Sequence, residues 1–522
     1  MSASISLVLG LGDSGLAMAR WLARDGTPVR VWDSRAEPPQ AAGLREHVPG
    51  AEIVGGALDA ASLEGVARIV KSPGLAPTDT RIAAMLAAAR IEGIPVQGEL
   101  DLFVEALDAL RVAHDYAPKL IAVTGTNGKT TTTAMTALLV EAAGRRVAVA
   151  GNIGPTMLQT LADAIDAGPV EALRDRLPDV WVLELSSFQL DGTGNGPADF
   201  EPDAAALLNL TEDHLDWHGS FAAYGEAKAR VFGSRAVIVV DAGDAAVAAL
   251  LPAPKPVAVR KGRPPKSIAR QVVYFGATAP GRPGDFGIVV QNDMAWLARA
   301  RSDDEGTAGA DAAVALQLLM PADAMRVRGR HNALNGLAAL ALATAIGCPL
   351  APMLHALREY HGEPHRVEYV ASVGGVDAFD DSKGTNVGAT VAALEGLGAE
   401  RAPNKLVVIL GGDGKGQDFA PLAAPLGRYA RAVITVGRDA ARIEAAVEAT
   451  VAAAGIEIER CVSLEGAVDA AFAHARSGDA VLLSPACASL DMFRNYGHRA
   501  EVFVAAVQAL AGAEHIAVGS PA

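Results

Sequence analysis

Thr124-Gly125-Thr126-Asn127-Gly128-Lys129-Thr130 is the stretch that decides the fold of this 522-residue chain. It follows the apolar run Leu120 to Val123, which has the length of a buried strand, and it precedes a helix-forming segment. A glycine-rich loop in this setting binds phosphate through backbone N–H groups and the helix dipole, while the lysine and the Thr130 hydroxyl serve phosphate and Mg²⁺. Val123 stands where the standard motif has its first glycine. The stretch predicts an ATP site in a parallel α/β domain.

Outward from this loop, short β-branched runs alternate with alanine-rich helical segments, which is typical of βαβ units and parallel sheets. The clearest expected strands are Ile5 to Leu9, Val29 to Trp32, Leu120 to Val123, Val180 to Glu184, Val237 to Val240, Leu406 to Leu410, Val433 to Val436 and Val481 to Leu483. Turn-prone breaks predict three domains, at residues 1–110, 111–364 and 365–522. We expect a Rossmann-like N-terminal domain, a central P-loop-type ATPase domain with a parallel sheet, and a C-terminal Rossmann-like α/β domain.

Two segments of the central domain depart from this alternation. Residues 254–310 are rich in Pro, Gly, Lys and Arg and then turn acidic, so we interpret them as an insertion. The charge-free stretch Gly336 to Leu354 carries two prolines, which predicts a buried helix that ends at Pro349 and not a membrane span.

Composition narrows the class of protein. Half of the residues are apolar and the formal net charge is −15, so we expect a globular protein with no nucleic-acid partner and no membrane partner. The three cysteines are too far apart for a C-x-x-C site, which predicts buried thiols in a reducing compartment. The N-terminus has no basic region followed by an apolar signal segment, so the cytoplasm is the expected location.

A second glycine loop, Gly10-Leu11-Gly12-Asp13-Ser14-Gly15, follows the first expected strand. Asp33 ends the second strand, where a carboxylate accepts a hydrogen bond from a ribose hydroxyl. This pattern fits NAD or FAD, a different nucleotide, or a structural turn. The phosphate loop downstream disfavours a dehydrogenase.

Further candidates lie near the carboxyl ends of other strands, where open α/β sheets bind ligands. Glu184 is placed to hold Mg²⁺ next to the phosphates, although a helix-capping acid has the same position. Asn209 to His218 is dense in possible ligands for a hard cation. The alternative is a purely structural role, as a helix start with capping acids. Lys228, in the helical segment that follows, is an ordinary solvated lysine on residue-level reasoning alone.

Four late clusters complete the pattern. They are Pro364-His365-Arg366, Asp380 to Asn386, Gly411 to Gly416 and Ser484 to Ser489. Each offers a cation or a hydroxyl next to a strand, and each by itself is a common strand-to-helix loop. Together they predict an anionic ligand at the sheet edge of the last domain.

These motifs, in this order, resemble the Mur ligases of peptidoglycan synthesis. The residues that carry the resemblance are GTNGKTT from Gly125, GNIG from Gly151, LELSSFQL from Leu183, NLTEDHLD from Asn209, HNALN from His331, PHR from Pro364, DSKGTN from Asp381, GGDGK from Gly411 and SPACASLDMF from Ser484. GTNGK and TEDH are shared with folylpolyglutamate synthetases. LELSSFQL, DSKGTN and SPACASLD resemble the members that add D-glutamate.

The resemblance implies an ATP-dependent, amide-forming ligase of cell-wall biogenesis that adds D-glutamate to UDP-N-acetylmuramoyl-L-alanine through an acyl phosphate. It implies ATP as co-substrate, two Mg²⁺ ions and a carbamylated Lys228. We also expect a monomer.

The site residues follow by the same resemblance. The catalytic residues would be Lys129, Glu184, His214 and Lys228. The metal ligands would be Thr130, Glu184, His214 and Lys228. ATP contacts would come from Gly125, Thr126, Asn127, Gly128, Lys129, Thr130, Thr131, Asn335, Arg366 and Asp381. Substrate contacts would come from Ser14, Asp33, Ser34, Arg35, Gly74, Asn152, Ser186, Gln189, Lys383, Thr385, Lys415, Ser489 and Tyr496.

Some positions depart from the family pattern. Asp13 stands where an apolar residue is found, and Tyr496 stands where phenylalanine is expected. Residues 254–310 and Asp191 to Phe200 are longer than in compact members. The alternatives are a sister ligase for another amino acid, a folylpolyglutamate synthetase, a NAD-dependent dehydrogenase, and an inactive UDP-sugar sensor.

Overall fold

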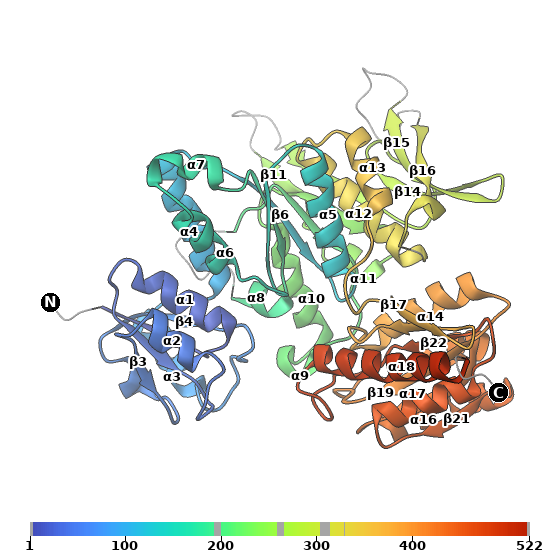
Figure 1. Cartoon of the computed structure of the whole chain (residues 1–522). Helices are drawn as coiled ribbons and strands as arrows, with labels where there is room; N and C mark the ends of the chain where they lie inside the picture. Colours follow the sequence, from blue (N-terminus) through green and yellow to red (C-terminus); the bar gives the residue numbers. More distant parts are fainter. Residues whose placement is uncertain (1–3, 193–199, 258–265, 303–313, 328, 519–522) are drawn as a thin grey trace.

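The computed structural model of the chain has three lobes, each built around its own mostly parallel sheet (Figure 1). The structure describes residues 4–192, 200–257, 266–302, 314–327 and 329–518. The central lobe connects the N-terminal lobe, drawn in blue, with the C-terminal lobe, drawn in orange and red. The predicted three-domain α/β architecture is confirmed, while the limits 1–110, 111–364 and 365–522 stay a prediction.

The N-terminal sheet has the strand order β3-β2-β1-β4-β5, which is the Rossmann order. Its strands are β1 (Ile5–Leu9), β2 (Val29–Trp32), β3 (Glu52–Val54), β4 (Val66–Lys71) and β5 (Val96–Gln97). The helices are α1 (Asp13–Ala23), α2 (Ala41–His47), α3 (Ala83–Glu92) and α4 (Glu99–His114). Alternate residues of β1 serve opposite faces, since Leu7 and Leu9 share a core with α3 whereas Val8 packs in the core with α1.

The central sheet has the parallel order β13-β10-β9-β6-β8-β7. Its strands are β6 (Lys119–Thr124), β7 (Val147–Gly151), β8 (Val180–Glu184), β9 (Ala204–Leu207), β10 (Val237–Asp241) and β13 (Val272–Phe275). The helices are α5 (Lys129–Ala142), α6 (Met157–Asp166), α7 (Leu173–Arg176), α8 (Ser187–Asp191), α9 (Leu215–His218), α10 (Phe221–Ala229), α11 (Ala245–Ala248), α12 (Arg330–Ala345) and α13 (Leu350–Glu359). Helices α5, α12 and α13 cover one face, and α4 and α6 cover the other.

The interpretation of residues 254–310 as an insertion is wrong for part of its length. β13 lies inside that range and pairs in parallel with β10, so it is the edge strand of the central sheet. The remaining strands are the hairpin β11 (Lys255–Val257) and β12 (Lys266–Ile268), and the antiparallel sheet β14 (Phe286–Gln291), β15 (Met294–Ser302) and β16 (Val314–Pro321). Residues 258–265 and the acidic stretch 303–313 lie outside the described residues, as do residues 193–199 of the long segment after Asp191.

The buried helix that was expected to end at Pro349 is α12, which ends at Ala345. Pro349 is also the N-cap of a further helix, α13, which was not expected from the sequence. A proline without an N–H group is tolerated at a helix start, so Pro349 follows one helix and precedes the next. α12 is buried as predicted, and none of the helices in the described part of the chain has the length and apolar character of a membrane span.

The C-terminal sheet has the order β17-β18-β22-β19-β20-β21, with β17 as an antiparallel edge. Its strands are β17 (Glu368–Val373), β18 (Val376–Asp380), β19 (Leu406–Gly411), β20 (Ala430–Val436), β21 (Glu457–Arg460) and β22 (Ala480–Leu483). The helices are α14 (Val387–Arg401), α15 (Ala423–Tyr429), α16 (Ala440–Ala453), α17 (Leu464–His474) and α18 (Tyr496–Val518). All eight strands expected from the sequence lie within observed strands.

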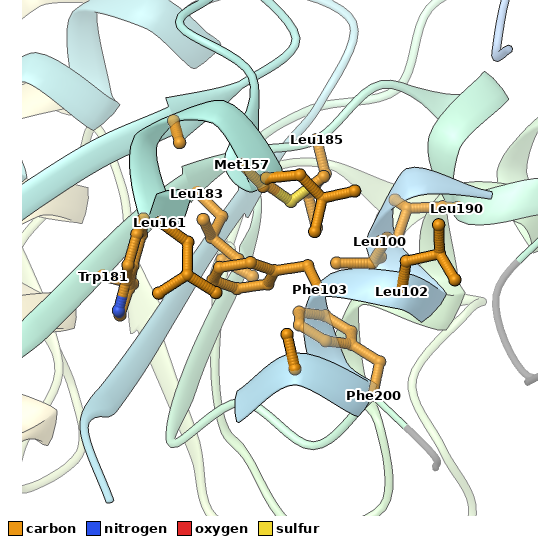
Figure 2. Packing of buried hydrophobic residues seen from close by; sticks show 14 of the residues in the cluster. Leu100, Leu102, Phe103, Met157, Leu161, Trp181, Leu183, Leu185, Leu190 and Phe200 are labelled. Carbon is orange, nitrogen blue, oxygen red and sulfur yellow. The ribbon is translucent and has the colours of Figure 1, made fainter. Parts of the chain in front are cut away.

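The core continues from the N-terminal lobe into the central one (Figure 2). Phe103 of α4 meets Trp181 of β8 edge-on, with ring centroids 4.9 Å apart. Leu100 and Leu102 of α4 lie beside Leu190 in the same cluster. Because α4 packs on the central sheet, it fixes the first lobe beside the second. The cysteines are free, and Cys461 is partly exposed, contrary to the prediction of three buried thiols.

Candidate functional site

The glycine loop after β1 forms one wall of a cavity of about 890 Å³. The cavity brings together six residues expected to contact substrate, which are Ser14, Asp33, Ser34, Arg35, Gly74 and Asn152. Asp33 is buried, and its carboxylate accepts hydrogen bonds from the Leu11 amide at 2.7 Å and from the Arg35 guanidinium at 2.8 Å. The hydrogen bond from Arg35 lowers the pKa of Asp33 to about 2, against the opposing effect of burial. The carboxylate is therefore fixed and ionised beside the loop.

A second cavity, of about 450 Å³, lies between the central and C-terminal sheets. It is lined by the phosphate loop of the central domain and by loops of the last domain, with these expected residues among its walls: Thr126, Asn127, Gly128, Lys129, Thr131, Glu184, His214, Asn335, Arg366, Asp381, Lys383 and Thr385. Lys129 lies folded onto its own loop, since its Nζ donates to the carbonyls of Gly125 at 2.9 Å and Thr126 at 2.8 Å. Burial lowers its pKa, while nearby carboxylates oppose that shift.

Arg366 joins the last domain to the phosphate loop. Its Nη2 donates to Thr130 Oγ1 at 2.6 Å, across 236 positions of sequence. Asn386 Nδ2 donates to Asn127 Oδ1 at 3.0 Å, which is a second bond across the same boundary. The side chain of Asn335 lies against Gly128, where an added Cβ would come within 2.6 Å of its Oδ1. The phosphate loop is thus enclosed by side chains from two domains.

Glu184 lies where the two cavities meet. It is buried at the end of β8, and its Oε1 accepts a hydrogen bond from Asn152 Nδ2 at 2.9 Å. Asn152 and Ile153 line both cavities. A ligand that begins at the first glycine loop can therefore extend to the phosphate loop without leaving the protein surface.

The structure corrects the interpretation of Lys228 as an ordinary solvated lysine. It is 2% exposed, and its Nζ donates to the Gly125 carbonyl at 2.8 Å. Burial holds the pKa of Lys228 well below its ordinary value, and the neighbouring Lys129 ammonium lowers it further. Residue-level reasoning could not find this burial, because one lysine in a helical segment looks solvated until the packing is known.

Asp213 is a site residue that sequence reasoning did not single out, although it lies in the quoted TEDH motif. Its buried carboxylate is 3.5 Å from His214 Nε2 and 3.9 Å from Lys415 Nζ. Burial lowers the pKa of His214 to about 4, so its imidazole is neutral at pH 7. His331, which opens the HNALN motif, also lines the second cavity. The TEDH and HNALN motifs pointed to Asp213 and His331, but the sequence alone did not show which side chains they would contact.

The loop after β18 lines the second cavity and is bonded to the loop after β22. Asp381 is buried and accepts a hydrogen bond from Ser484 Oγ at 2.6 Å, and burial raises its pKa to about 7. Lys383 Nζ lies 3.8 Å from the ring centroid of Tyr496. Burial lowers the pKa of Lys383 to about 8, with a further contribution from Arg366.

Some expected residues lie apart from the cavities or have other partners. Among the residues that line the second cavity, Lys415, Ser489 and Tyr496 are absent. Ser186 and Gln189 form a capping box at the start of α8, in which the Gln189 amide N–H donates to Ser186 Oγ at 3.3 Å. That pair has a structural role, and its contact with a substrate stays a prediction.

Comparisons with known proteins follow the same division of the chain. Residues 4–98 match the family described as Mur ligase MurD-like, N-terminal domain, residues 123–343 match the Mur ligase middle domain, and residues 365–487 match the Mur ligase, glutamate ligase domain. The chain is 56% identical over 513 residues to a UDP-N-acetylmuramoylalanine--D-glutamate ligase of Albidiferax ferrireducens, covering 97% of this chain and 96% of that one. It is 55% identical over 518 residues to a ligase of the same name from Burkholderia pseudomallei, covering 97% of each.

Solved structures agree in fold. The MurF ligase of Thermotoga maritima in complex with ADP superposes with a TM-score of 0.54 at 15% identity, over 92% of this chain and 95% of that one. A folylpolyglutamate synthase of Mycobacterium tuberculosis complexed with ADP has a TM-score of 0.50 at 17% identity, over 81% of this chain and 98% of that one. At these identities the likeness concerns the fold alone.

Proposed function

The chain belongs to the Mur ligase family, and we propose that it uses ATP to join D-glutamate to UDP-N-acetylmuramoyl-L-alanine in peptidoglycan precursor synthesis. One structural observation carries this proposal. The cavity at the first glycine loop and the cavity at the phosphate loop meet at Asn152, beside Glu184. A nucleotide-linked substrate that lies in the first cavity would present its carboxylate to ATP in the second.

The glycine loop after β1 would then hold the UDP end of the substrate. Asp33 is fixed as an ionised acceptor, which suits a hydroxyl or N–H of the uridine. Ser14 lies at the N-terminus of α1, where a pyrophosphate is favoured by the helix dipole. Arg20, Arg35 and Arg81 also line this cavity and add positive charge next to the phosphates. Among the described residues that line this cavity, we find none placed for hydride transfer, which disfavours the dehydrogenase hypothesis.

Phosphoryl transfer to the substrate carboxylate would take place at the second loop. The N–H groups at the start of α5 and Lys129 would stabilise the charge of the transferred phosphoryl group. Arg366 reaches the same loop from the last domain and supplies a second cation. The acyl phosphate formed in this step would be attacked by the amine of D-glutamate, and phosphate would leave as the amide bond forms.

The donor set next to the phosphate loop fits Mg²⁺, with Thr130, Glu184, His214 and Lys228 as proposed ligands. Two ions would neutralise phosphate charge and polarise the reacting oxygens. Lys228 fits this role only as a carbamate, because an amine is a poor ligand for a hard cation. Its depressed pKa supports the modification, since only a neutral amine reacts with carbon dioxide. The neutral imidazole of His214 has a free lone pair to offer.

D-glutamate would lie against the loops of the C-terminal sheet. Lys383 and Thr385 line the second cavity, and Lys415 reaches Asp213 at its rim. Their charges and hydroxyl suit the two carboxylates of the amino acid. Ser489 and Tyr496 are proposed to complete this site, with the Tyr496 ring holding Lys383 in place. One chain supplies every proposed site residue, which supports a monomer, and its nucleotide-activated substrate and ATP support action in the cytoplasm.

The test is phosphate release from ATP in the presence of UDP-N-acetylmuramoyl-L-alanine. D-glutamate is compared with L-glutamate, meso-diaminopimelate, L-lysine and no amino acid. We expect release with D-glutamate alone. Release with another amino acid would make the protein a sister ligase, and absence of release with all of them would contradict the proposal and favour the sensor or the folate ligase.

A further inference from the structure

The turn His365-Arg366-Val367, where the chain enters the C-terminal domain, has an unusual backbone. His365 has φ of 63° and Val367 has φ of 51°, so both residues flanking Arg366 are left-handed. L-residues rarely adopt this region, and a β-branched side chain is among the least suited to it. Such conformations persist where the surrounding structure holds them, and they concentrate at functional sites.

The His365 side chain makes one of the contacts that hold this turn. Its Nδ1 is 2.7 Å from Asp380 Oδ2, and Asp380 is fully buried at the end of β18. The other oxygen of that carboxylate accepts from the Ser382 amide at 2.9 Å and from its hydroxyl at 2.6 Å. The side chains of His365, Asp380 and Glu368 lie close enough together to be candidate ligands of a metal ion. The 2.7 Å separation has the length of a direct hydrogen bond, so the pair needs no ion between its members.

The backbone of His365 is held on both sides. Its N–H donates to Glu368 Oε2 at 2.8 Å, and its carbonyl accepts from the Lys383 N–H at 3.2 Å. The turn is therefore attached to β17, to β18 and to the loop that carries Asp381 and Lys383. Arg366, between the two strained residues, points to Thr130 Oγ1 at 2.6 Å.

We propose that His365 and Asp380 are positioning residues, which hold the strained turn so that Arg366 reaches the phosphate loop of the central domain. The inference rests on the proposed function, in which Arg366 contacts the ATP phosphates. His365 acts through Arg366 and touches neither ATP nor substrate. The bond between the Lys383 N–H and the His365 carbonyl involves the backbone alone, so it does not depend on the imidazole.

The first test is a double-mutant cycle on D-glutamate-dependent phosphate release. We expect His365→Ala to lower kcat on the order of 10- to 100-fold through misplacement of Arg366, with KM for the UDP substrate unchanged within about twofold. In an Arg366→Ala background the same change should cost no more than about twofold. Fully additive losses, or a loss confined to KM for the UDP substrate, would overturn the proposal.

The second test is relief of strain. Glycine adopts positive φ without cost, so Val367→Gly added to His365→Ala should recover part of the lost kcat. An equal or lower kcat in the double variant would count against a strained turn. Asp380→Asn should resemble His365→Ala, because an amide cannot accept from the imidazole and from Ser382 with the same strength.

A matched control and a second readout keep folding separate from positioning. His474 forms the same kind of pair with Glu459, at 2.9 Å. Glu459 lies on β21, at the opposite edge of the C-terminal sheet from β17, so His474→Ala should leave kcat unchanged. Calorimetric titration with ADP reports the phosphate site without turnover, and His365→Ala should weaken it only where Arg366 is present. If wild type releases no phosphate with any amino acid, the proposed function fails. The ADP affinities of the single and double variants still test whether His365 positions Arg366.

Discussion

Lys228 and Glu184 show how single residues acquire chemistry from their surroundings. Both are almost completely buried near Lys129, in a site where charges are poorly screened by water. A buried amine next to an ammonium loses its proton readily, and a neutral amine is reactive. The arrangement explains why a lysine that looks ordinary in sequence has a place next to the phosphate loop.

Replacement of Lys228 by alanine should abolish phosphate release, by at least about 100-fold, because the proposed carbamate oxygen ligand is lost. Added bicarbonate should not restore activity, since no amine remains, whereas a short-chain carboxylic acid should restore part of it by entering the vacated space. The measurement is D-glutamate-dependent phosphate release. Lys119→Ala is the control, because Lys119 lies at the surface in an ion pair with Asp203. Near-normal activity of Lys228→Ala would remove the carbamate from the mechanism.

Glu99 gives a prediction about pH and stability. Burial raises its pKa to about 7, although the Leu158 amide donates to it at 3.0 Å. The folded protein therefore holds this proton above pH 4.5, where the unfolded chain releases it. The stability that Glu99 contributes is fully present below about pH 4.5 and is lost as pH rises through 7.

Glu99→Gln keeps the shape and cannot ionise, so it should gain stability relative to wild type between pH 5 and pH 8, by up to about 3 kcal/mol. Denaturant midpoints measured at both pH values check this. Asp108→Asn, at an exposed position of the same helix, should show no such gain. A pH-independent difference between Glu99→Gln and wild type would contradict the buried proton.

At the scale of elements, the β1–α1 unit depends on close backbone approach. A Cβ at Gly15 would lie 1.9 Å from the Gly10 carbonyl oxygen, whereas a Cβ at Gly12 would meet nothing within 4 Å. The two glycines of this loop therefore serve different purposes. Gly15 lets α1 pack against the end of β1. Gly12 lines the first cavity, where the lack of a side chain leaves more room for a ligand.

Gly15→Ala should therefore displace α1, lower the thermal midpoint and raise KM for the UDP substrate, with a destabilisation of about 2 kcal/mol or more. Gly12→Ala should leave the thermal midpoint within about a degree or two of wild type, since its φ of −93° suits any residue. Thermal unfolding of both variants tests the difference. Equal midpoints would show that α1 does not need the close contact.

At the scale of the molecule, the second cavity exists only where two domains meet. Its walls come from the phosphate loop and from the C-terminal loops, and Arg366 and Asn386 bridge them. The chemistry requires both domains, so their approach should depend on what lies between them.

Small-angle scattering should show a smaller radius of gyration when an ATP analogue and the UDP substrate are added to wild type, because bound phosphates attract cations from both domains. Arg366→Ala should reduce this change, since it removes one bridge. His474→Ala, remote from the boundary, should behave as wild type does. An unchanged radius of gyration in wild type would contradict ligand-dependent closure.

The sequence by itself determined eight of the strands and their alternation with helices, the two glycine loops and the three-domain architecture, because periodicity and loop chemistry are local properties. It failed in residues 254–310, which were interpreted as an insertion and contain an edge strand of the central sheet. It also missed the helix that follows Pro349, because the proline was interpreted only as the end of the helix before it.

Only the tertiary structure decided which groups lose water and which loops meet. The burial of Lys228, the role of Asp213 and the contact between Arg366 and Thr130 depend on segments that are far apart in sequence. Desolvation and contact across domains are set by packing of the whole chain, and no spacing of residues encodes them directly.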